Sequence, residues 1–371
     1  MKVAFVHDHL VQYGGAERVL SAMQAIWPDA PTYTLHYDPQ TVGWAFGHKD
    51  IRPSFLERLP FSRRAFRWLL PLMPLATERY DLSDYDVVIS NSSGFAKGII
   101  TGPNTLHICY CHTPTRYLWS DKESYVEELR VPGVIKFLLP LLLHHLRTWD
   151  QLAAARVDHF IANSATVEQR IKKYYRRDSS VIYPPVDTHL FNVTENPKNY
   201  FLAGGRLVSY KRFDLVVDAF TKIGKPLKIF GTGPVEQDLK RRAGKNIDFL
   251  GRVTDEERAR LFENSIAFIN PQEEDFGITV VESMAAGRPV IAYRRGGATE
   301  TVIDGVTGQL FDRQTWQDIA DLVMRFDERK FDSKKIRAHA EQYSLTTFRT
   351  ELIKAVDERW REHRRTMLGA A

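Results

Sequence analysis

The chain has 371 residues, with 51 lysines and arginines against 46 aspartates and glutamates, which gives a formal net charge of +5 at pH 7. This length is too great for one ordinary hydrophobic core, so we expect two domains. No uncharged apolar stretch reaches about 18 residues, which excludes a membrane-spanning helix, and the first apolar run is too short for a signal peptide. Cys109 and Cys111 are poorly spaced for a mutual disulfide, which favours a reducing, cytoplasmic setting.

The first predicted strand, residues 3–6, is followed by a loop that contains a glycine pair. Gly14 and Gly15 stand before a helix that should begin near Ala16. Glycines between a strand and a helix let a phosphate or a sugar approach the backbone. The pattern matches neither the dinucleotide-binding motif nor a P-loop, so a tight turn with packing glycines is the alternative. The preceding His7-Asp8-His9 lacks the further clustered ligands that a metal site needs.

Residues 52–75 mix arginines with large apolar side chains, among them Arg63, Arg64, Arg67 and Trp68. This mixture would suit a surface helix that lies on anionic lipid. An ordinary amphipathic helix packed on its own domain is the alternative. Several prolines exclude a single long helix across the stretch.

Two further strands are predicted at residues 87–89 and 106–111. Asp84 and Asp86 match a D-x-D pattern but enter their strand at its amino end, whereas ligand sites of α/β sheets lie at the carboxyl ends. His107, Cys109 and Cys111 share one strand face, where side chains in a row do not converge on one ion. His112 follows the strand at its carboxyl end and is a candidate functional residue.

Alternating strands and helices continue through both halves of the chain. The apolar run 133–148 is interrupted by Pro140 and reads as a buried or interfacial helix, and 181–187 closes the first half before a polar linker at 192–199. We expect an α/β protein with two doubly wound, Rossmann-like domains facing a cleft. Their expected extents are 1–188 and 189–345.

A basic loop led by glycine follows the first strand of the second half. Arg206 offers a planar fork and Lys211 a point charge, a combination suited to a diphosphate, although two solvated surface charges are the alternative. A helix should start after Gly277, and its free N–H groups form a third anion-binding element. These elements could stabilise a departing nucleoside diphosphate without a metal.

Glu274 lies just before this helix start and Glu282 lies after it. The two glutamates are the first and last residues of an E-x7-E motif. A retaining glycosidase pair would need its carboxyl groups about 5 Å apart. A loop position and a position one turn into a helix suggest roughly 8–10 Å instead. We therefore expect the two glutamates to hold opposite ends of one extended ligand through its hydroxyls.

Taken together, these motifs resemble those of the family 4 retaining glycosyltransferases of GT-B fold. The resemblance runs nearly end to end, and the residues that carry it are 14–17 (Gly-Gly-Ala-Glu), 110–117 (Tyr-Cys-His-Thr-Pro-Thr-Arg-Tyr), 182–187 (Ile-Tyr-Pro-Pro-Val-Asp), 205–207 with Lys211, and 274–282. The second and third stretches more closely resemble bacterial polysaccharide and O-antigen mannosyltransferases.

The resemblance implies a role for each candidate residue. Arg206 and Lys211 would bind the donor diphosphate, aided by backbone amides near Phe276, Gly277 and Ile278. Glu282 would take the ribose hydroxyls and Glu274 those of the donor sugar. The remaining implied contacts are His112 to the sugar, Gly15 beside the phosphate and acceptor, and Arg252 with Val253 beside the base.

The implied reaction is transfer of a sugar, mannose from GDP-mannose, onto a polyprenyl-diphosphate-linked saccharide during cell-surface polysaccharide synthesis. Front-face attack, in which the leaving phosphate takes the acceptor's proton, would retain the anomeric configuration. No metal, cofactor or nucleic acid is expected, and the helix at 346–371 should return to the first domain. A UDP- or dTDP-linked donor, a GT-B epimerase and a non-catalytic nucleotide-sugar-binding protein are the alternatives. We expect a cytoplasmic protein with peripheral contact to the membrane.

Overall fold

The computed structural model describes residues 1–59, 66–120, 133–195 and 197–367, and at 66–68 and 133–138 it describes the backbone alone. The chain divides into two compact units. Unit 1 comprises Met1–Tyr183 together with Phe348–Ala371, and unit 2 comprises Pro184–Thr347. The boundary lies between Tyr183 and Pro184, directly before the Pro184-Pro185 pair, whereas the sequence suggested residue 188.

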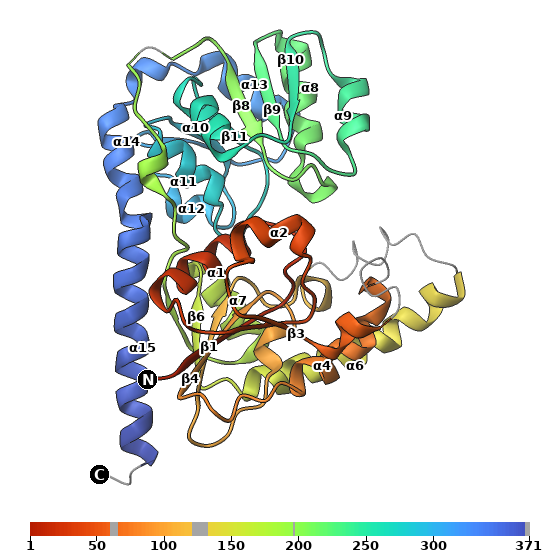
Figure 1. Ribbon diagram of the computed structural model, residues 1–371. Helices are drawn as coiled ribbons and strands as arrows, with labels where there is room; N and C mark the ends of the chain where they lie inside the picture. Colours follow the sequence, from red (N-terminus) through yellow and green to blue (C-terminus); the bar gives the residue numbers. More distant parts are fainter. Residues whose placement is uncertain (60–65, 121–132, 196, 368–371) are drawn as a thin grey trace. The chain divides into compact units, whose positions relative to one another are not determined.

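Unit 1 is built on a parallel sheet of seven strands in the order β3-β2-β1-β4-β5-β6-β7 (Figure 1). The central strands β1, β4 and β5 are buried on both faces, and this burial extends to the polar residues Asn91 of β4 and His107 of β5. The strands are β1 (Val3–His7), β2 (Thr32–Thr34), β3 (Ile51–Pro53), β4 (Val87–Ser92), β5 (Leu106–Cys111), β6 (His159–Ala162) and β7 (Ser179–Val181).

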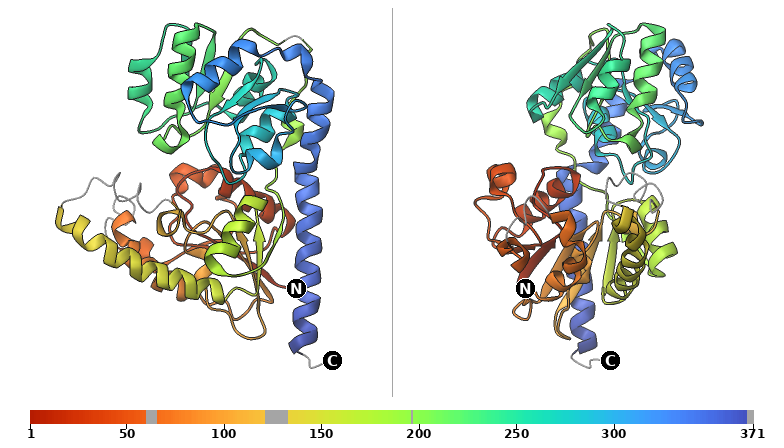
Figure 2. Two further views of the ribbon diagram at one scale, coloured as in Figure 1. Left: turned by 180° about the vertical axis from the view of Figure 1, so that it is seen from behind. Right: turned by 90° about the vertical axis from the view of Figure 1, so that its right-hand side faces the viewer.

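Helices cover both faces of this sheet, and the last helix of the chain runs along unit 1 in every view (Figure 2). Phe348, Leu352 and Val356 of that helix are buried in the same core cluster as Phe5 and Ile89. The helices of unit 1 are α1 (Gly15–Ile26), α2 (Pro39–Phe46), η1 (Phe55–Arg58), η2 (Phe66–Leu72), α4 (Met73–Glu78), η3 (Ala96–Gly98), η4 (Arg116–Leu118), α6 (Gly133–Ala155), α7 (Ala165–Tyr175) and α15 (Leu345–Met367).

Unit 2 repeats the plan with a parallel sheet of six strands in the order β10-β9-β8-β11-β12-β13. The strands are β8 (Phe201–Gly204), β9 (Leu227–Phe230), β10 (Ile247–Gly251), β11 (Phe268–Asn270), β12 (Val290–Tyr293) and β13 (Gly308–Phe311). Its helices are η5 (Thr188–Leu190), η6 (Ser209–Lys211), α8 (Phe213–Ile223), α9 (Glu236–Arg242), α10 (Asp255–Glu263), α11 (Ile278–Ala285), α12 (Ala298–Thr301), α13 (Trp316–Arg325), η7 (Glu328–Lys330), α14 (Ser333–Ala340) and η8 (Glu341–Tyr343).

Both sheets reverse their strand order beside their first strand, between β1 and β4 in unit 1 and between β8 and β11 in unit 2. In doubly wound sheets, ligands bind outside the carboxyl ends of the strands at this switch point. The predicted fold class, two doubly wound Rossmann-like domains, is confirmed at the level of each unit. The fold therefore identifies two places where a site should be sought.

The stretch expected to contact a membrane is divided among short elements. Residues 52–75 contribute to β3, η1, η2 and α4, so the exclusion of one long helix holds. Arg63 and Arg64 lie outside the described residues, as do the side chains of Arg67 and Trp68. No helix within the described ranges is long and apolar enough to cross a membrane.

Candidate active site

At the switch point of unit 2, the loops after β8 and β11 carry the residues that the sequence singled out. The α11 helix starts after Gly277, whose φ of 88° is a left-handed conformation that a side chain would strain. The first N–H groups of a helix have no intrahelical acceptor, and the helix dipole adds positive potential there. The start of α11 at Ile278 thus provides an anion-binding element beside the switch point.

Lys211 and Glu274 join the two loops through an ion pair. Lys211 Nζ lies 2.7 Å from Glu274 Oε1, with the two side chains 14% and 18% exposed. Gln272 Nε2 donates a second hydrogen bond to the same carboxylate oxygen at 3.2 Å. Burial alone would lower the pKa of Lys211, but the adjacent Glu274 carboxylate raises it above its ordinary value, so the lysine is charged. Arg206 lies exposed on the same loop as Lys211.

Glu282 has a partner that the sequence did not reveal. Arg258 of α10 donates from Nη2 to Glu282 Oε1 at 3.0 Å and from Nη1 to Asp255 at 2.6 Å. The Glu282 side chain is 5% exposed, so a nearly buried carboxylate is neutralised and oriented by one guanidinium. The arginine therefore fixes where the Glu282 carboxylate can accept hydrogen bonds.

Other residues of this switch point were also missed by sequence reasoning. Asn270 Oδ1 and Gln272 Oε1 are buried at the end of β11, and neither has a hydrogen-bond partner within the described part of the chain. Buried acceptors without partners are rare, and a bound hydroxyl or water would satisfy them. A Cβ added at Gly297 would lie 2.4 Å from Phe276 Cα, so a glycine lets this loop pack on the residues before α11. The only sequence signal was the pair Gly296-Gly297 after a strand.

Arg252 and Val253, expected beside the base, line a cavity of about 430 Å³ in unit 2. Tyr200 and Lys228 line it as well, and Lys228 Nζ lies 4.6 Å from the centroid of the Tyr200 ring. The cavity adjoins the loop after β10 on the side of the sheet that α10 covers, because Glu257, Arg260 and Leu261 of that helix also line it.

At the switch point of unit 1, the polar residues lie at the carboxyl ends of three neighbouring strands. Asn91 of β4 is the register partner of His7 at the end of β1, and His112 follows β5 directly. His112 Nε2 lies 2.5 Å from Asn91 Oδ1. Burial lowers the pKa of His112 to about 4, so the imidazole is neutral at pH 7. Gly15 is the first residue of α1 beside this cluster.

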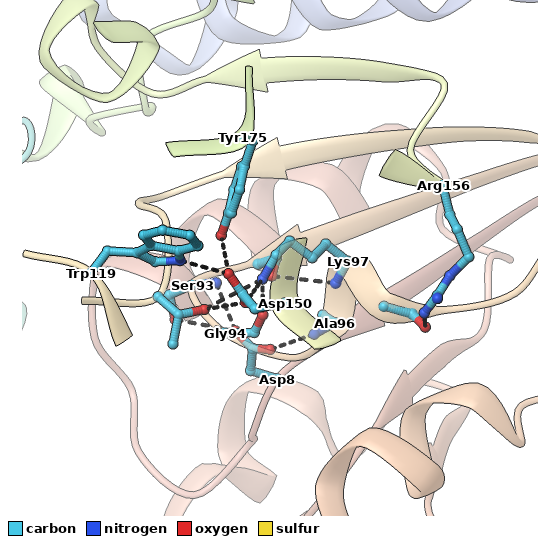
Figure 3. Close-up of polar contacts among 12 residues, drawn as sticks. Asp8, Ser93, Gly94, Ala96, Lys97, Trp119, Asp150, Arg156 and Tyr175 are labelled. Carbon is cyan, nitrogen blue, oxygen red and sulfur yellow. Dashed lines mark hydrogen bonds and ion pairs between the residues drawn. The ribbon is translucent and has the colours of Figure 1, made fainter. Parts of the chain in front are cut away.

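A buried carboxylate anchors the loop that carries His112 (Figure 3). Asp150 of α6 accepts hydrogen bonds from Thr115 and Trp119 of the loop after β5, and from Tyr175, at 2.8 to 2.9 Å. Lys97 Nζ lies 2.5 Å from the same carboxylate, and both side chains are 1% exposed. The loop is thereby fixed to α6 and α7 by one charged group.

Asp8 has a corresponding role for the neighbouring loop after β4. Its carboxylate accepts from the backbone N–H groups of Ser93 and Ala96, at 2.6 Å each. Asp8 is therefore occupied by backbone groups (Figure 3), as Asp86 is by the N–H of Lys2. In the described ranges, no three His, Cys, Asp or Glu side chains are grouped so that they could hold a metal ion.

The structure thus brings Arg206, Lys211, Glu274, Gly277 and Ile278 together around the switch point of unit 2. Glu282 lies one turn further along α11, and Arg252 and Val253 lie on the loop after β10. His112 and Gly15 lie around the switch point of unit 1. The four residues expected to contact a membrane or an acceptor lie, in whole or in their side chains, outside the described residues.

Two Rossmann-like units of this strand order, each with its polar loops at the switch point, define an α/β protein of the GT-B class. The model for glycosyl transferases group 1 matches residues 187–344, and the model for glycosyltransferase family 4 matches residues 35–190. The chain belongs to the family 4 glycosyltransferases, and the resemblance noted in the sequence is confirmed.

Curated relatives include mannosyltransferases. The alpha-1,3/1,6-mannosyltransferase ALG2 of Dictyostelium discoideum is 25% identical over 410 residues, which cover 92% of this chain and 93% of that protein. The O-antigen chain mannosyltransferase C of Escherichia coli is 28% identical over 188 residues, covering 46% of this chain and 48% of that protein.

Solved structures share the fold at low sequence identity. Sucrose-phosphate synthase from Thermosynechococcus elongatus superposes with a TM-score of 0.75 at 16% identity, covering 98% of this chain and 100% of that one. Anabaena Alr3699/HepE, solved in complex with UDP, has a TM-score of 0.71 at 17% identity, covering 96% of this chain and 100% of that one. These likenesses concern the fold.

Proposed function

We propose that this glycosyltransferase moves mannose from GDP-mannose onto a lipid-linked saccharide, with retention of the anomeric configuration. The mannosyl donor is supported by relatives named as mannosyltransferases. The saccharide carrier is a polyprenyl diphosphate, and the product belongs to a cell-surface polysaccharide.

The observation that carries this proposal is the Lys211–Glu274 pair beside the start of α11. A nucleoside diphosphate needs positive charge where its bond to the sugar breaks, and Arg206, Lys211 and the helix N–H groups supply it without a metal. Glu274, in contact with Lys211, is next to the place where the sugar would meet that diphosphate. It accepts hydrogen bonds from sugar hydroxyls, and Glu282 accepts them from the ribose.

Transfer then needs no enzymatic base. The acceptor hydroxyl attacks the anomeric carbon from the side on which the diphosphate departs, and its proton passes to the departing phosphate oxygen. One carbon–oxygen bond forms while another breaks, and the products are the α-mannoside and GDP. The protein contributes orientation and charge stabilisation, which together supply most of the lowering of the barrier in reactions of this type.

The donor is tested with a panel of GDP-, UDP- and dTDP-sugars, by thermal shift and by release of nucleotide in the presence of a polyprenyl-diphosphate saccharide. A ligand that binds the folded state raises the unfolding temperature. Preferential stabilisation and turnover with GDP-mannose is the expected result. Preference for a UDP- or dTDP-sugar would replace the donor, and epimerised sugar without transfer would overturn the proposal.

A further inference from the structure

Four polar side chains form a continuous chain across the switch point of unit 1. Glu17 Oε1 lies 3.5 Å from His7 Nε2, His7 Nδ1 lies 3.1 Å from Asn91 Nδ2, and Asn91 Oδ1 lies 2.5 Å from His112 Nε2. They come from α1, from two neighbouring strands, and from the loop after β5. His7, Glu17 and Asn91 are 2%, 4% and 0% exposed, so water does not separate them.

The orientation of the Asn91 amide is determined by a backbone carbonyl. Asn91 Nδ2 lies 2.9 Å from the carbonyl oxygen of Ala16, which can only accept a hydrogen bond. The amide nitrogen must therefore face Ala16, and the amide oxygen must face His112. An amide oxygen can only accept, so His112 Nε2 carries a proton.

The same reasoning assigns the protons of His7. The second hydrogen of Asn91 Nδ2 points to His7 Nδ1, which must accept it, so the His7 proton is on Nε2. His7 Nε2 lies 3.5 Å from the Glu17 carboxylate, an ion-pair distance at which the described residues form no hydrogen bond. The other oxygen of Glu17 accepts from the N–H of Gly14 at 2.7 Å. The chain thus ends on the backbone of the glycine loop.

We propose that Asn91, His7 and Glu17 are positioning residues that hold His112 as the neutral Nε2–H tautomer, with Nδ1 as a hydrogen-bond acceptor for a substrate hydroxyl. Within the described part of the chain, the Nδ1 atom of His112 makes no hydrogen bond, and the side chain is partly exposed. An imidazolium would present a donor at this place. The inference rests on the proposed function in that a sugar supplies the hydroxyl.

The groups around His112 are compatible with this assignment. His7, Asp8 and Glu17 are the ionisable groups that act on it, and the Tyr110 ring packs edge-on with its centroid 5.3 Å from that of His112. Asp8 is held by the backbone of the loop after β4, and the Tyr110 hydroxyl donates to the carbonyl of Ile182. Neither supplies a proton to His112 Nδ1.

The test replaces the amide by an isosteric carboxylate. In Asn91→Asp, the carboxylate should raise the pKa of His112 into the neutral range. We expect histidine-labelled NMR titration to show His112 charged near pH 6 in the variant and uncharged in the wild type, with His112→Gln used to assign the signal. Transfer by the variant should fall at acidic pH and recover as the pH rises. Asn104→Asp, at the other end of β5, is the matched control and should leave the titration unchanged.

A second pair of variants tests the relay through His7. His7→Asn keeps an acceptor oxygen near the place of Nδ1, whereas His7→Leu removes it. We expect His7→Asn to retain most of kcat/KM and His7→Leu to lose about tenfold or more, the effect of one hydrogen bond to a reacting site. Equal loss in both variants, or an Asn91→Asp variant that leaves His112 uncharged and lowers activity by one factor at every pH, would overturn the proposal. The NMR titration needs no substrate, so it stands even if GDP-mannose proves not to be the donor.

Discussion

Lys211 Nζ and Glu274 Oε1 lie 2.7 Å apart, and this pair connects the loop after β8 to the loop after β11 across the switch point of unit 2. The carboxylate of Glu274 keeps Lys211 charged in a partly buried place. A diphosphate that binds there meets a lysine whose charge is already balanced. Binding therefore redistributes an existing pair of charges, so the effects of mutating Lys211 and Glu274 should not be additive.

We predict that Lys211→Ala lowers kcat about 10²–10³-fold, because a cation placed where charge develops in the transition state is removed. Steady-state kinetics with the preferred donor provide the measurement. Lys240→Ala, which removes an exposed lysine paired with Glu236 on α9, is the control and should keep normal turnover. A Lys211→Ala enzyme with normal kcat would refute the role assigned to this lysine.

We predict that Glu282→Gln weakens binding of GDP by about 1.5–3 kcal/mol, the usual contribution of hydrogen bonds to a charged group. Calorimetry with GDP and with its 2′,3′-dideoxy analogue provides the measurement. The variant and the wild type should bind the analogue equally, because it lacks the hydroxyls that the carboxylate accepts from. If Glu282→Gln weakens binding of the dideoxy analogue as much as binding of GDP, Glu282 does not contact the ribose hydroxyls. Its role would then be structural, through Arg258.

We predict that unit 1 loses stability as the pH falls from about 6.5 towards 4. Burial lowers the pKa of His9, His112 and His159 to about 4 and that of His107 to about 3, whereas 6.5 is their ordinary value. Between these values the unfolded chain binds protons that the folded unit excludes, which costs about 1.4 kcal/mol for each pKa unit.

Calorimetric unfolding temperatures across this pH range provide the measurement. His107→Gln removes one titrating group and keeps a polar atom near Ser90, to which His107 Nε2 is hydrogen-bonded at 2.8 Å. Its unfolding temperature should depend less steeply on pH than that of the wild type. An identical slope would show that His107 is not the group that resists protonation.

We predict that Lys97→Met destabilises unit 1 by about 3–5 kcal/mol, because the Asp150 carboxylate would remain buried without its cation. Lys97→Met/Asp150→Leu, with both charges removed, should recover part of that loss. Thermal unfolding of the two variants is the measurement. The pKa of Lys97 is raised above 10.5, since Asp150 outweighs the burial that would lower it, so the contribution is present below that pH and is lost as the pH rises through the folded-state pKa. If the double variant is no more stable than Lys97→Met, the loss of stability does not come from the unpaired Asp150 charge.

We predict that the elements around residues 66–78 and α6 contact anionic membranes. Leu72, Leu75 and Leu141 are 39%, 49% and 67% exposed, and η2, α4 and α6 contribute to one apolar cluster. A triple serine variant should partition into anionic vesicles at least about tenfold less than the wild type. Met324→Ser, at an exposed apolar residue of α13 in unit 2 (56% exposed), is the control and should partition as the wild type does. Equal partitioning of the triple variant would reject the contact.

Much of the fold could be predicted because strands of a buried parallel sheet have largely apolar sequences. Residues 3–6 were predicted in this way. His112 was placed correctly at the carboxyl end of the strand that begins at Leu106. Gly277 correctly indicated the start of α11, because the left-handed backbone conformation at that position favours glycine.

The partners of the predicted residues could not be predicted. Glu282 pairs with Arg258 across 24 positions, and nothing in the sequence distinguishes this arginine from the exposed Arg260 of the same helix. Asn91 lies near the end of β4, and asparagine is also common in turns. Its place in the sheet therefore could not be predicted from its residue type. Which side chains meet across a sheet depends on strand order, and the sequence gives no measure of that order before the fold is known.

Phe348, Leu352 and Val356 of α15 complete the core of unit 1, which is otherwise made by residues 1–183. During synthesis, the first half of the chain leaves the ribosome long before this helix exists. Unit 2 has all of its residues by position 347, so it can finish folding while unit 1 still exposes the apolar surface that α15 will cover. The half that is made first is therefore the half that is finished last.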